Sequence, residues 1–181
     1  MSTLTRTLSA VTVAGLSALF LAAPQPAQAY SEISCFGAGD ASFSSEVGMA
    51  TESTDVSYRG KERSCIDHSG AGITSARFSV TFDDVPLSCA ATHFGGVGST
   101  GTAIIEWKMN GAKQISELDV YIDETMLNDI KIRGVVTKGV FKNRRFTGMF
   151  DMNLVGRSGK CATGSFDTVN STSFDGDFSI D

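Results

Sequence analysis

The sequence has few of the residues from which metal and redox sites are built. It contains two histidines, His68 and His93, and no C-x-x-C or H-x-x-x-H motif among its 181 residues. Zinc sites in proteins need Cys and His ligands clustered at short spacings. We therefore expect neither a bound metal nor a cofactor.

Positive charge is also scarce. The chain has 15 Lys and Arg residues against 20 Asp and Glu residues, which gives a net charge of −5. Domains that bind nucleic acid are generally basic, because they must neutralise phosphates. The acidic balance therefore argues against a nucleic acid as the main partner.

Long apolar runs are missing apart from one, at residues 10–23. This run follows Arg6 and precedes the small-x-small sequence AQA at 27–29, a pattern typical of a cleaved export signal. The run is shorter than the roughly 20 residues that a membrane-spanning helix needs. We expect a signal peptide at residues 1–29 and a secreted, extracellular domain at residues 30–181, with no membrane span. Loss of Arg6 makes the net charge 14 − 20 = −6.

All four cysteines lie in the expected mature domain, at Cys35, Cys65, Cys89 and Cys161. An even number of cysteines in an exported chain predicts two disulfides. Three pairings are possible, and spacing alone does not decide between them. We favour Cys35 with Cys65 and Cys89 with Cys161, because each bridge then ties the start of one expected strand to the end of another.

What the chain has in abundance is two-residue alternation of apolar and polar side chains. In residues 74–82 the apolar set is Ala76, Phe78, Val80 and Phe82, and the residues between them are polar. This period is typical of a strand with one buried face. The pattern recurs through the chain and predicts an all-β protein.

A β-hairpin is expected around Asn110-Gly111, the dipeptide best suited to a type I′ turn. Counting outward from that turn pairs Met109 with Ala112 and Trp107 with Gln114. The same register places Trp107 and Leu118 on one face and leaves the charged residues on the other.

Further strands are expected at 133–141 and 144–155, and a last pair at 162–169 and from Phe174 onward, with a turn at Asn170-Ser171. Residues 123–129 are expected to form a turn or a single helical turn.

Eight or nine antiparallel strands separated by Gly, Ser and Asn turns indicate a β-sandwich or a small closed β-barrel with two disulfides. We favour the sandwich.

Three short motifs suggest chemistry, but their contexts do not support it. The GVGSTG string at 96–101 matches a dinucleotide-binding loop, yet a strand rather than a helix is expected to follow it. Asp67-His68-Ser69 has the residue types of a hydrolase triad, but triad members come from distant positions. The acidic stretches at 117–129 and 175–177 lack the spacing of a calcium loop, so we interpret them as solvated strand faces.

Candidate binding residues lie in three expected loops, at 67–72, 90–101 and 142–145. Small-residue loops on a rigid β scaffold are typical of recognition surfaces. The cationic loop suits an anionic partner, and it also suits a charged edge that discourages aggregation. The candidates are His68, His93, Phe94, Lys142, Arg144 and Arg145.

Four segments resemble a group of small secreted actinobacterial proteins with a Gly/Ser/Thr-rich β domain behind an Ala-rich signal. They are 72–78 (GITSARF), 87–89 (LSC), 101–107 (GTAIIEW) and 134–141 (GVVTKGVF). The resemblance covers roughly residues 55 to 180 and rests on strand and turn patterns. It implies secretion and a β fold. The group has no assigned activity, so the resemblance assigns no functional residue.

The function that these observations favour is non-catalytic recognition of an extracellular protein, glycan or wall polymer. A secreted hydrolase using paired carboxylates is an alternative, and it would need a cleft lined by partly buried acids. An inhibitor of extracellular proteases is another, with residues 85–89 (VPLSC) as its binding segment. A membrane barrel is a further alternative. One face of each expected strand carries charges such as Arg77 and Glu106, and whether those charges face a lumen decides it.

Overall fold

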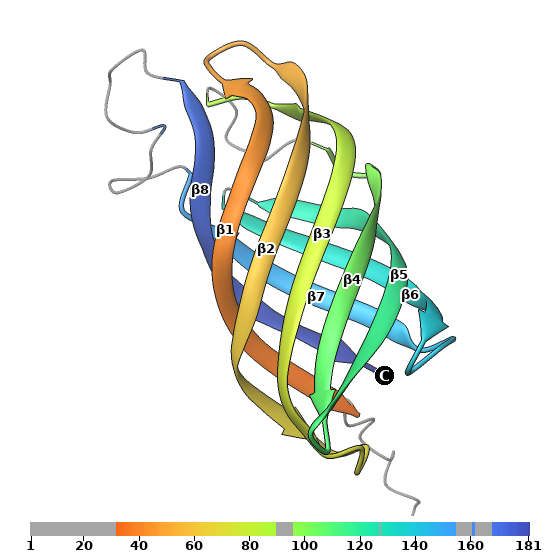
Figure 1. Cartoon of the computed structure of the whole chain (residues 1–181). Helices are drawn as coiled ribbons and strands as arrows, with labels where there is room; N and C mark the ends of the chain where they lie inside the picture. Colours follow the sequence, from red (N-terminus) through yellow and green to blue (C-terminus); the bar gives the residue numbers. More distant parts are fainter. Residues whose placement is uncertain (1–31, 90–95, 127, 155–160, 162–167) are drawn as a thin grey trace, which may run out of the picture.

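Eight strands form one closed antiparallel barrel in the computed structural model, which describes residues 32–89, 96–126, 128–154, 161 and 168–181 (Figure 1). The strands are β1 (Ile33–Val47), β2 (Glu52–Asp67), β3 (Ile73–Leu87), β4 (Thr100–Met109), β5 (Ala112–Met126), β6 (Asp129–Gly139), β7 (Arg145–Met152) and β8 (Val169–Ile180). In the described part of the chain, no helix is long and apolar enough to cross a membrane.

The barrel corrects our preference for a sandwich. Each strand pairs with the next along the chain, and β8 then pairs with β1 from Ile33↔Ile180 to Ser42↔Ser171. The sheet therefore closes on itself and has no exposed edge. Alternation could not reveal this, because strands of a sandwich and of a filled barrel both bury every second residue.

The expected hairpin around Asn110-Gly111 is confirmed residue by residue. Met109 lies opposite Ala112 and Trp107 opposite Gln114, as the turn chemistry predicts. Asn110 and Gly111 have φ angles of 48° and 83°, the positive values that a type I′ turn requires. Trp107 and Leu118 are both buried.

One expected turn is shorter than expected, and another is wrong. Residues 123–126 continue β5 to Met126, and residues 170–171 lie inside β8, where Ser171 pairs with Ser42. Both segments look like turns because they are polar, but they lie on paired strands. The expected strand at 162–167 lies outside the described residues.

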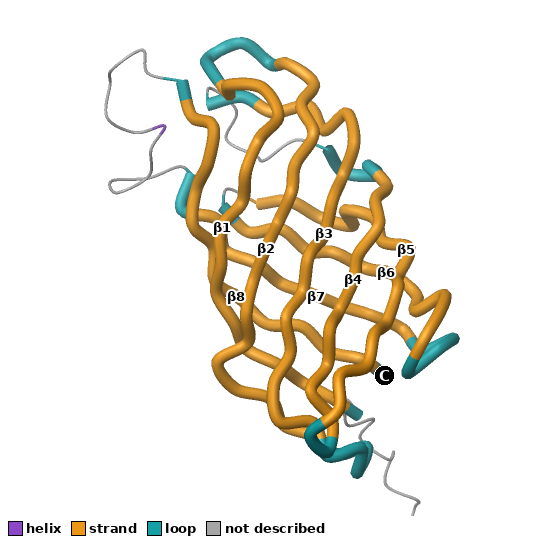
Figure 2. Tube along the Cα trace, in the orientation of Figure 1, coloured by secondary structure: helices purple, strands orange, loops and turns teal. Residues whose placement is uncertain are grey.

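The connections lie at two opposite ends of the barrel, as Figure 2 shows. The lower end contains the turns at 68–72, 110–111 and 140–144, together with the start of β1 and the end of β8 (Figure 1). The connections β1–β2, β3–β4, β5–β6 and β7–β8 lie at the upper end.

Aromatic side chains fill the barrel interior. Phe78 stacks on Phe150 with ring centroids 5.4 Å apart, and Tyr58 meets Phe174 edge-on at 5.6 Å. An eight-stranded barrel is just wide enough for side chains to fill it. Tyr58 is 1% exposed, and its hydroxyl donates to the Met152 sulfur at 3.1 Å. Burial raises the pKa of this phenol far above its ordinary value.

A buried hydrogen-bond chain lies toward the lower end of the interior. The Trp107 indole Nε1–H donates to Ser116 Oγ at 2.9 Å, and the Ser116 hydroxyl donates to the Val140 carbonyl at 2.6 Å. The Phe141 ring packs edge-on against Trp107 at 5.5 Å, although Phe141 has a φ of 63°, which is rare for a bulky residue. These contacts anchor the β6–β7 turn to the core.

Both disulfides form with the favoured pairing. Cys35 and Cys65 face each other directly across β1 and β2, and Cys35 is buried. The second bridge links Cys89, just after β3, to Cys161 in the β7–β8 connection. Two disulfides are typical of a protein that matures in an oxidising compartment.

Candidate functional site

The structure separates the three loops in which binding residues were expected. The loops containing His68 and Lys142 both lie at the lower end, whereas Gly96–Gly101 lies at the upper end. His93 and Phe94 lie outside the described residues. The four described candidates, His68, Lys142, Arg144 and Arg145, therefore lie at one end of the barrel.

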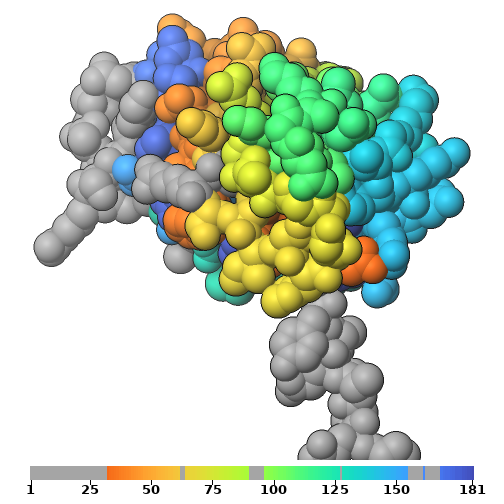
Figure 3. Space-filling model, turned by 60° about the horizontal axis from the view of Figure 1, so that its bottom comes forward, coloured from red at the N-terminus to blue at the C-terminus, as the bar shows by residue number. Residues whose placement is uncertain are grey.

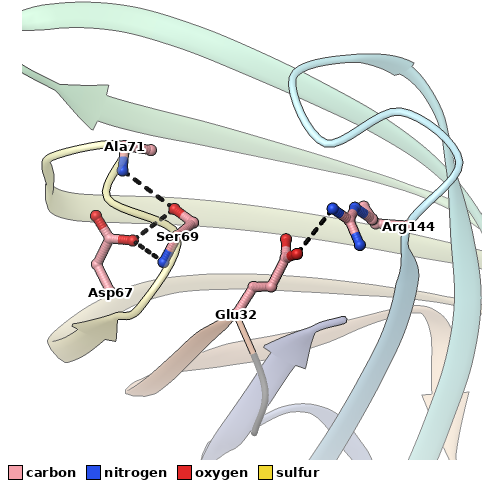
Figure 4. Close-up of polar contacts among 5 residues, drawn as sticks. All are labelled: Glu32, Asp67, Ser69, Ala71 and Arg144. Atoms are coloured by element: carbon pink, nitrogen blue, oxygen red, sulfur yellow. Dashed lines mark hydrogen bonds and ion pairs between the residues drawn. The ribbon is translucent and has the colours of Figure 1, made fainter. Parts of the chain in front are cut away.

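Asp67 organises the β2–β3 turn rather than a catalytic triad. Its carboxylate accepts hydrogen bonds from the Ser69 amide at 2.9 Å, the Ser69 hydroxyl at 2.6 Å and the Ile73 amide at 3.0 Å (Figure 4). Burial raises the pKa of Asp67, but hydrogen bonds from Ser69, Ile73 and Gly72 outweigh it and lower the pKa overall. The Ser69 hydroxyl contacts the carboxylate directly, so His68 does not bridge the two as a triad requires.

The cationic loop at 142–145 is partly neutralised. Arg144 Nη2 lies 2.7 Å from the Glu32 carboxylate, which comes from just before β1 (Figure 4). The Glu32 backbone carbonyl also accepts the amide of His68 at 2.8 Å, so Glu32 ties the two lower loops together. Lys142 and Arg145 are exposed, and their side chains have no ion-pair partner among the described residues. The loop thus keeps two of its three expected charges available.

A larger unpaired set of cations lies elsewhere, on the outer face of β2–β5. Lys61, Arg77, Lys108 and Lys113 surround a hollow of about 350 Å³ beside the β4–β5 turn. Among the side chains that the structure describes, Glu106 is the one acidic residue in the lining, and these five side chains carry a formal charge of 4 − 1 = +3. All five side chains are exposed. We call this hollow the cationic groove.

The strand register explains how residues far apart in sequence meet in the cationic groove. Lys61 lies directly opposite Arg77, Arg77 opposite Glu106, and Lys108 opposite Lys113. Figure 3 turns the lower end toward the viewer and shows the yellow β2–β3 segment beside the green β4–β5 hairpin. The alternation that buries Phe78 and Trp107 is what points their charged neighbours outward.

Like charges lie opposite each other in the cationic groove. Side chains directly opposite each other in an antiparallel sheet have Cβ atoms about 5 Å apart, and like charges at such positions are destabilising. Lys61 with Arg77 and Lys108 with Lys113 are two such pairs. None of the four cations makes an ion pair within 4 Å with a carboxylate in the described part of the chain. A bound anion would relieve this repulsion.

An acidic row lies on the other side of the barrel. Asp129, Asp151 and Asp175 are directly opposite one another across β6, β7 and β8. The row continues through Ala38 to Lys61, so one circumferential row changes from acidic to basic. Desolvation first, and then the charges of Asp129 and Asp175, raise the pKa of Asp151.

The carboxylates of the acidic row are not arranged as the ligands of a metal ion. Within the described residues, no group of three His, Cys, Asp or Glu side chains is arranged to hold a metal ion. Asp151 is exposed on the outward face of β7, so water reaches its carboxyl group, unlike the partly buried acid that a hydrolase cleft would need.

The segment expected to act as a protease-binding loop is part of the sheet. Val85 and Leu87 are buried in the core, and they pair with Thr54 and Glu52 of β2. The described part of this segment therefore offers no protruding loop to a protease.

Sequence reasoning found only part of the cationic groove. The hairpin register predicts that Lys108 and Lys113 face outward as a pair. Lys61 and Arg77 lie beside them only because of the β2–β3 register. The turn at 68–72 contains no dipeptide like Asn110-Gly111, from which the strand register could be predicted by counting outward. Cations that are close together in the sequence instead predict a binding loop at 142–145.

Comparison of the chain with protein-family models, with curated proteins and with solved structures finds no match in any of the three. The function must therefore be argued from the site itself.

Proposed function

We propose that this protein is an exported, non-catalytic recognition domain that binds an anionic extracellular polymer through the cationic groove. The observation that supports the proposal is the gathering of four unpaired cations around one hollow of a chain whose net charge is −5. A polymer bearing sulfate or phosphate groups matches this site, because repeated anions can contact several of the cations at once.

The rigidity of the barrel favours recognition by the outer face. The interior is occupied by packed aromatic rings, and the two disulfides join segments at both ends. A ligand that binds to strands rather than to loops meets side chains whose backbone is already ordered, so less conformational entropy is lost on binding.

Binding to dextran sulfate, inorganic polyphosphate and uncharged dextran tests the proposal. We expect the mature domain to bind at least one of the two polyanions and not the neutral polymer. The two polyanions distinguish a sulfate-bearing from a phosphate-bearing partner. Binding should weaken as salt rises from 0.1 to 1 M, because the screening length falls from about 10 Å to about 3 Å.

A double charge reversal, Lys108→Glu with Lys113→Glu, should weaken polyanion binding by about tenfold or more, since each exposed contact contributes about 0.5–1 kcal/mol. Lys142→Glu with Arg145→Glu is the matched control, because it changes the net charge by the same amount and both side chains are exposed outside the cationic groove. It should change the affinity less than about twofold. Equal effects of the two changes would show that binding follows net charge rather than the groove, and the proposal would be abandoned.

Export is proposed together with this function. We expect protein recovered from the culture medium to begin at Tyr30, with all four cysteines oxidised. N-terminal sequencing and a thiol assay check both points, and an intracellular product that retains residues 1–29 would contradict export.

A further inference from the structure

Tyr121 is an aromatic residue on the outer face of β5 with no partner for its ring. It is 41% exposed. Neither a ring contact nor a hydrogen bond to its hydroxyl occurs among the described residues, whereas Tyr58 and Trp107 are engaged in the core. An exposed, unpartnered aromatic face on a rigid strand is a potential ligand platform.

The hollow beside Tyr121 has a volume of about 650 Å³ and lies on the outer face of β3–β6. Its polar lining consists of acceptor and hydroxyl groups, with no cation: Asp83, Thr100, Thr102, Asp119 and Thr137. Neither Asp83 nor Asp119 makes an ion pair within 4 Å in the described structure. The lining therefore combines one aromatic face with two carboxylates that can accept hydrogen bonds.

Two glycines lie beneath this hollow, on either side of Val120. A Cβ atom added to Gly101 would lie 2.2 Å from the Thr81 carbonyl oxygen, and one added to Gly134 would lie 2.4 Å from that of Asp119. Neither position could accept a side chain without displacing the backbone. The glycines thus keep the strands close together under the hollow.

The hollow extends across several strands. It shares Tyr121 and Val135 with a neighbouring hollow of about 350 Å³ toward β7, and Thr102 and Asp119 with one of about 450 Å³ over β4–β6. These neighbours differ from the main hollow, because Arg133 and Arg145 line the first and Lys138 lines the second. From β4 to β7 this chain of hollows crosses three interstrand spacings, or about 14 Å. We call the main hollow beside Tyr121, without these two neighbours, the Tyr121 groove.

We propose that the Tyr121 groove binds an uncharged polysaccharide made of β-1,4-linked glucose or N-acetylglucosamine units. The hydroxyl groups of these pyranose rings lie equatorially, so the axial C–H bonds form an apolar face that can pack on the Tyr121 ring. The hydroxyls at the ring edge are donors, and Asp83 and Asp119 supply the carboxylate acceptors that make strong hydrogen bonds to them.

Charge distinguishes this ligand from the other candidates. The two carboxylates of the main hollow repel a polyanion, so this site differs from the cationic groove in the ligand it accepts.

Titration of the ¹⁵N-labelled mature domain with cellohexaose and with chitohexaose tests the proposal. At millimolar sugar, we expect amide shifts on β4–β6 around Thr102, Asp119 and Val135, and none in the cationic groove. The stronger of the two sugars identifies the unit that is bound. Absence of shifts with both sugars would overturn the proposal.

Three variants test whether the Tyr121 ring contributes to the affinity for the sugar. Tyr121→Ala should weaken binding about tenfold or more, because it removes an aromatic anchor, whereas Tyr121→Phe keeps the ring and should lose less than about threefold. Phe36→Ala is the matched control, because Phe36 is an exposed aromatic residue of β1, 45% exposed. Equal binding by the parent and Tyr121→Ala would refute the assignment.

Two further outcomes would also overturn it. If sedimentation shows a dimer that Tyr121→Ala dissociates, the Tyr121 groove is a subunit interface. If Lys108→Glu with Lys113→Glu abolishes sugar binding as well as polyanion binding, the two grooves are not separate sites.

Discussion

Replacing Ser116 with alanine should destabilise the barrel strongly for so small a change. Ser116 is fully buried, and its hydroxyl both accepts from the Trp107 indole and donates to the Val140 carbonyl. Alanine leaves the indole N–H without an acceptor, which costs about 1–3 kcal/mol for a buried donor. The Val140 carbonyl is only partly buried, and its loss of a donor adds about 0.5–1 kcal/mol.

The expected decrease in the free energy of unfolding is therefore about 1.5–4 kcal/mol. For a domain of this size, at about 2–4 °C per kcal/mol, that corresponds to a lowering of Tm by about 3–16 °C. Trp107 is the single tryptophan of the chain and is 1% exposed, so its fluorescence reports unfolding in urea directly.

Ser79→Ala is the matched control, because Ser79 faces outward on β3 and its side chain makes no hydrogen bond in the described structure. It should change the unfolding free energy by less than about 0.5 kcal/mol. A Ser116→Ala protein as stable as this control would refute the account of the Trp107 hydrogen-bond chain.

Three further predictions concern titration and cross-linking. Tyr58→Phe should be as stable as the parent at pH 7, or more stable by up to about 1 kcal/mol, because it removes a hydroxyl bonded to a weak sulfur acceptor. Burial raises the pKa of Tyr58 above its unfolded value of 10.0, so the parent should lose stability as the pH rises past 10. Tyr58→Phe should lose less stability over the same range. Urea unfolding of both proteins at pH 7 and pH 11 measures the difference. Asp151→Asn should be more stable than the parent at pH 7 by no more than about 1 kcal/mol. Because the folded pKa of Asp151 is raised, this difference should vanish as the pH falls below the unfolded pKa of 3.8. A difference that stays constant across this pH range would contradict the repulsion within the acidic row. Replacing Cys35 and Cys65 together with serine should cost about 3.6 kcal/mol by loop-closure entropy for a separation of 30 residues, and denaturant titration that finds no loss would contradict this.

The hairpin of β4 and β5 shows how far local chemistry predicts structure. Asn110-Gly111 determines the turn type, the turn type determines the register, and the register places Trp107 inside and Lys108 outside. Each step uses neighbours in sequence, so no knowledge of the rest of the fold is needed.

Barrel closure, unlike the hairpin, depends on residues that are far apart in the sequence. The choice between a sandwich and a barrel depends on the pairing of β1 with β8, whose paired residues Ile33 and Ile180 lie near opposite ends of the described chain. Alternation shows that both residues are buried but does not record which strand lies beside which. The preference for a sandwich was wrong for this reason.

The same limit applies to charge. Arg144 was expected to contact a partner because it lies in a cationic stretch, yet its carboxylate partner, Glu32, is far away in sequence. Conversely, Lys61 and Arg77 were not recognised as a pair because only the β2–β3 register brings them together. Charge clusters on a sheet follow strand pairing more than sequence distance.

Amide chemical-shift mapping with a short sulfated dextran oligosaccharide tests the central claim most directly, because it reports where on the barrel an anion binds. We predict shifts that saturate on the outer face of β2–β5, with Lys61, Arg77, Lys108 and Lys113 among the largest. Shifts confined to the loop at 142–145, or no shifts at low salt, would contradict the assignment of the cationic groove as the recognition site.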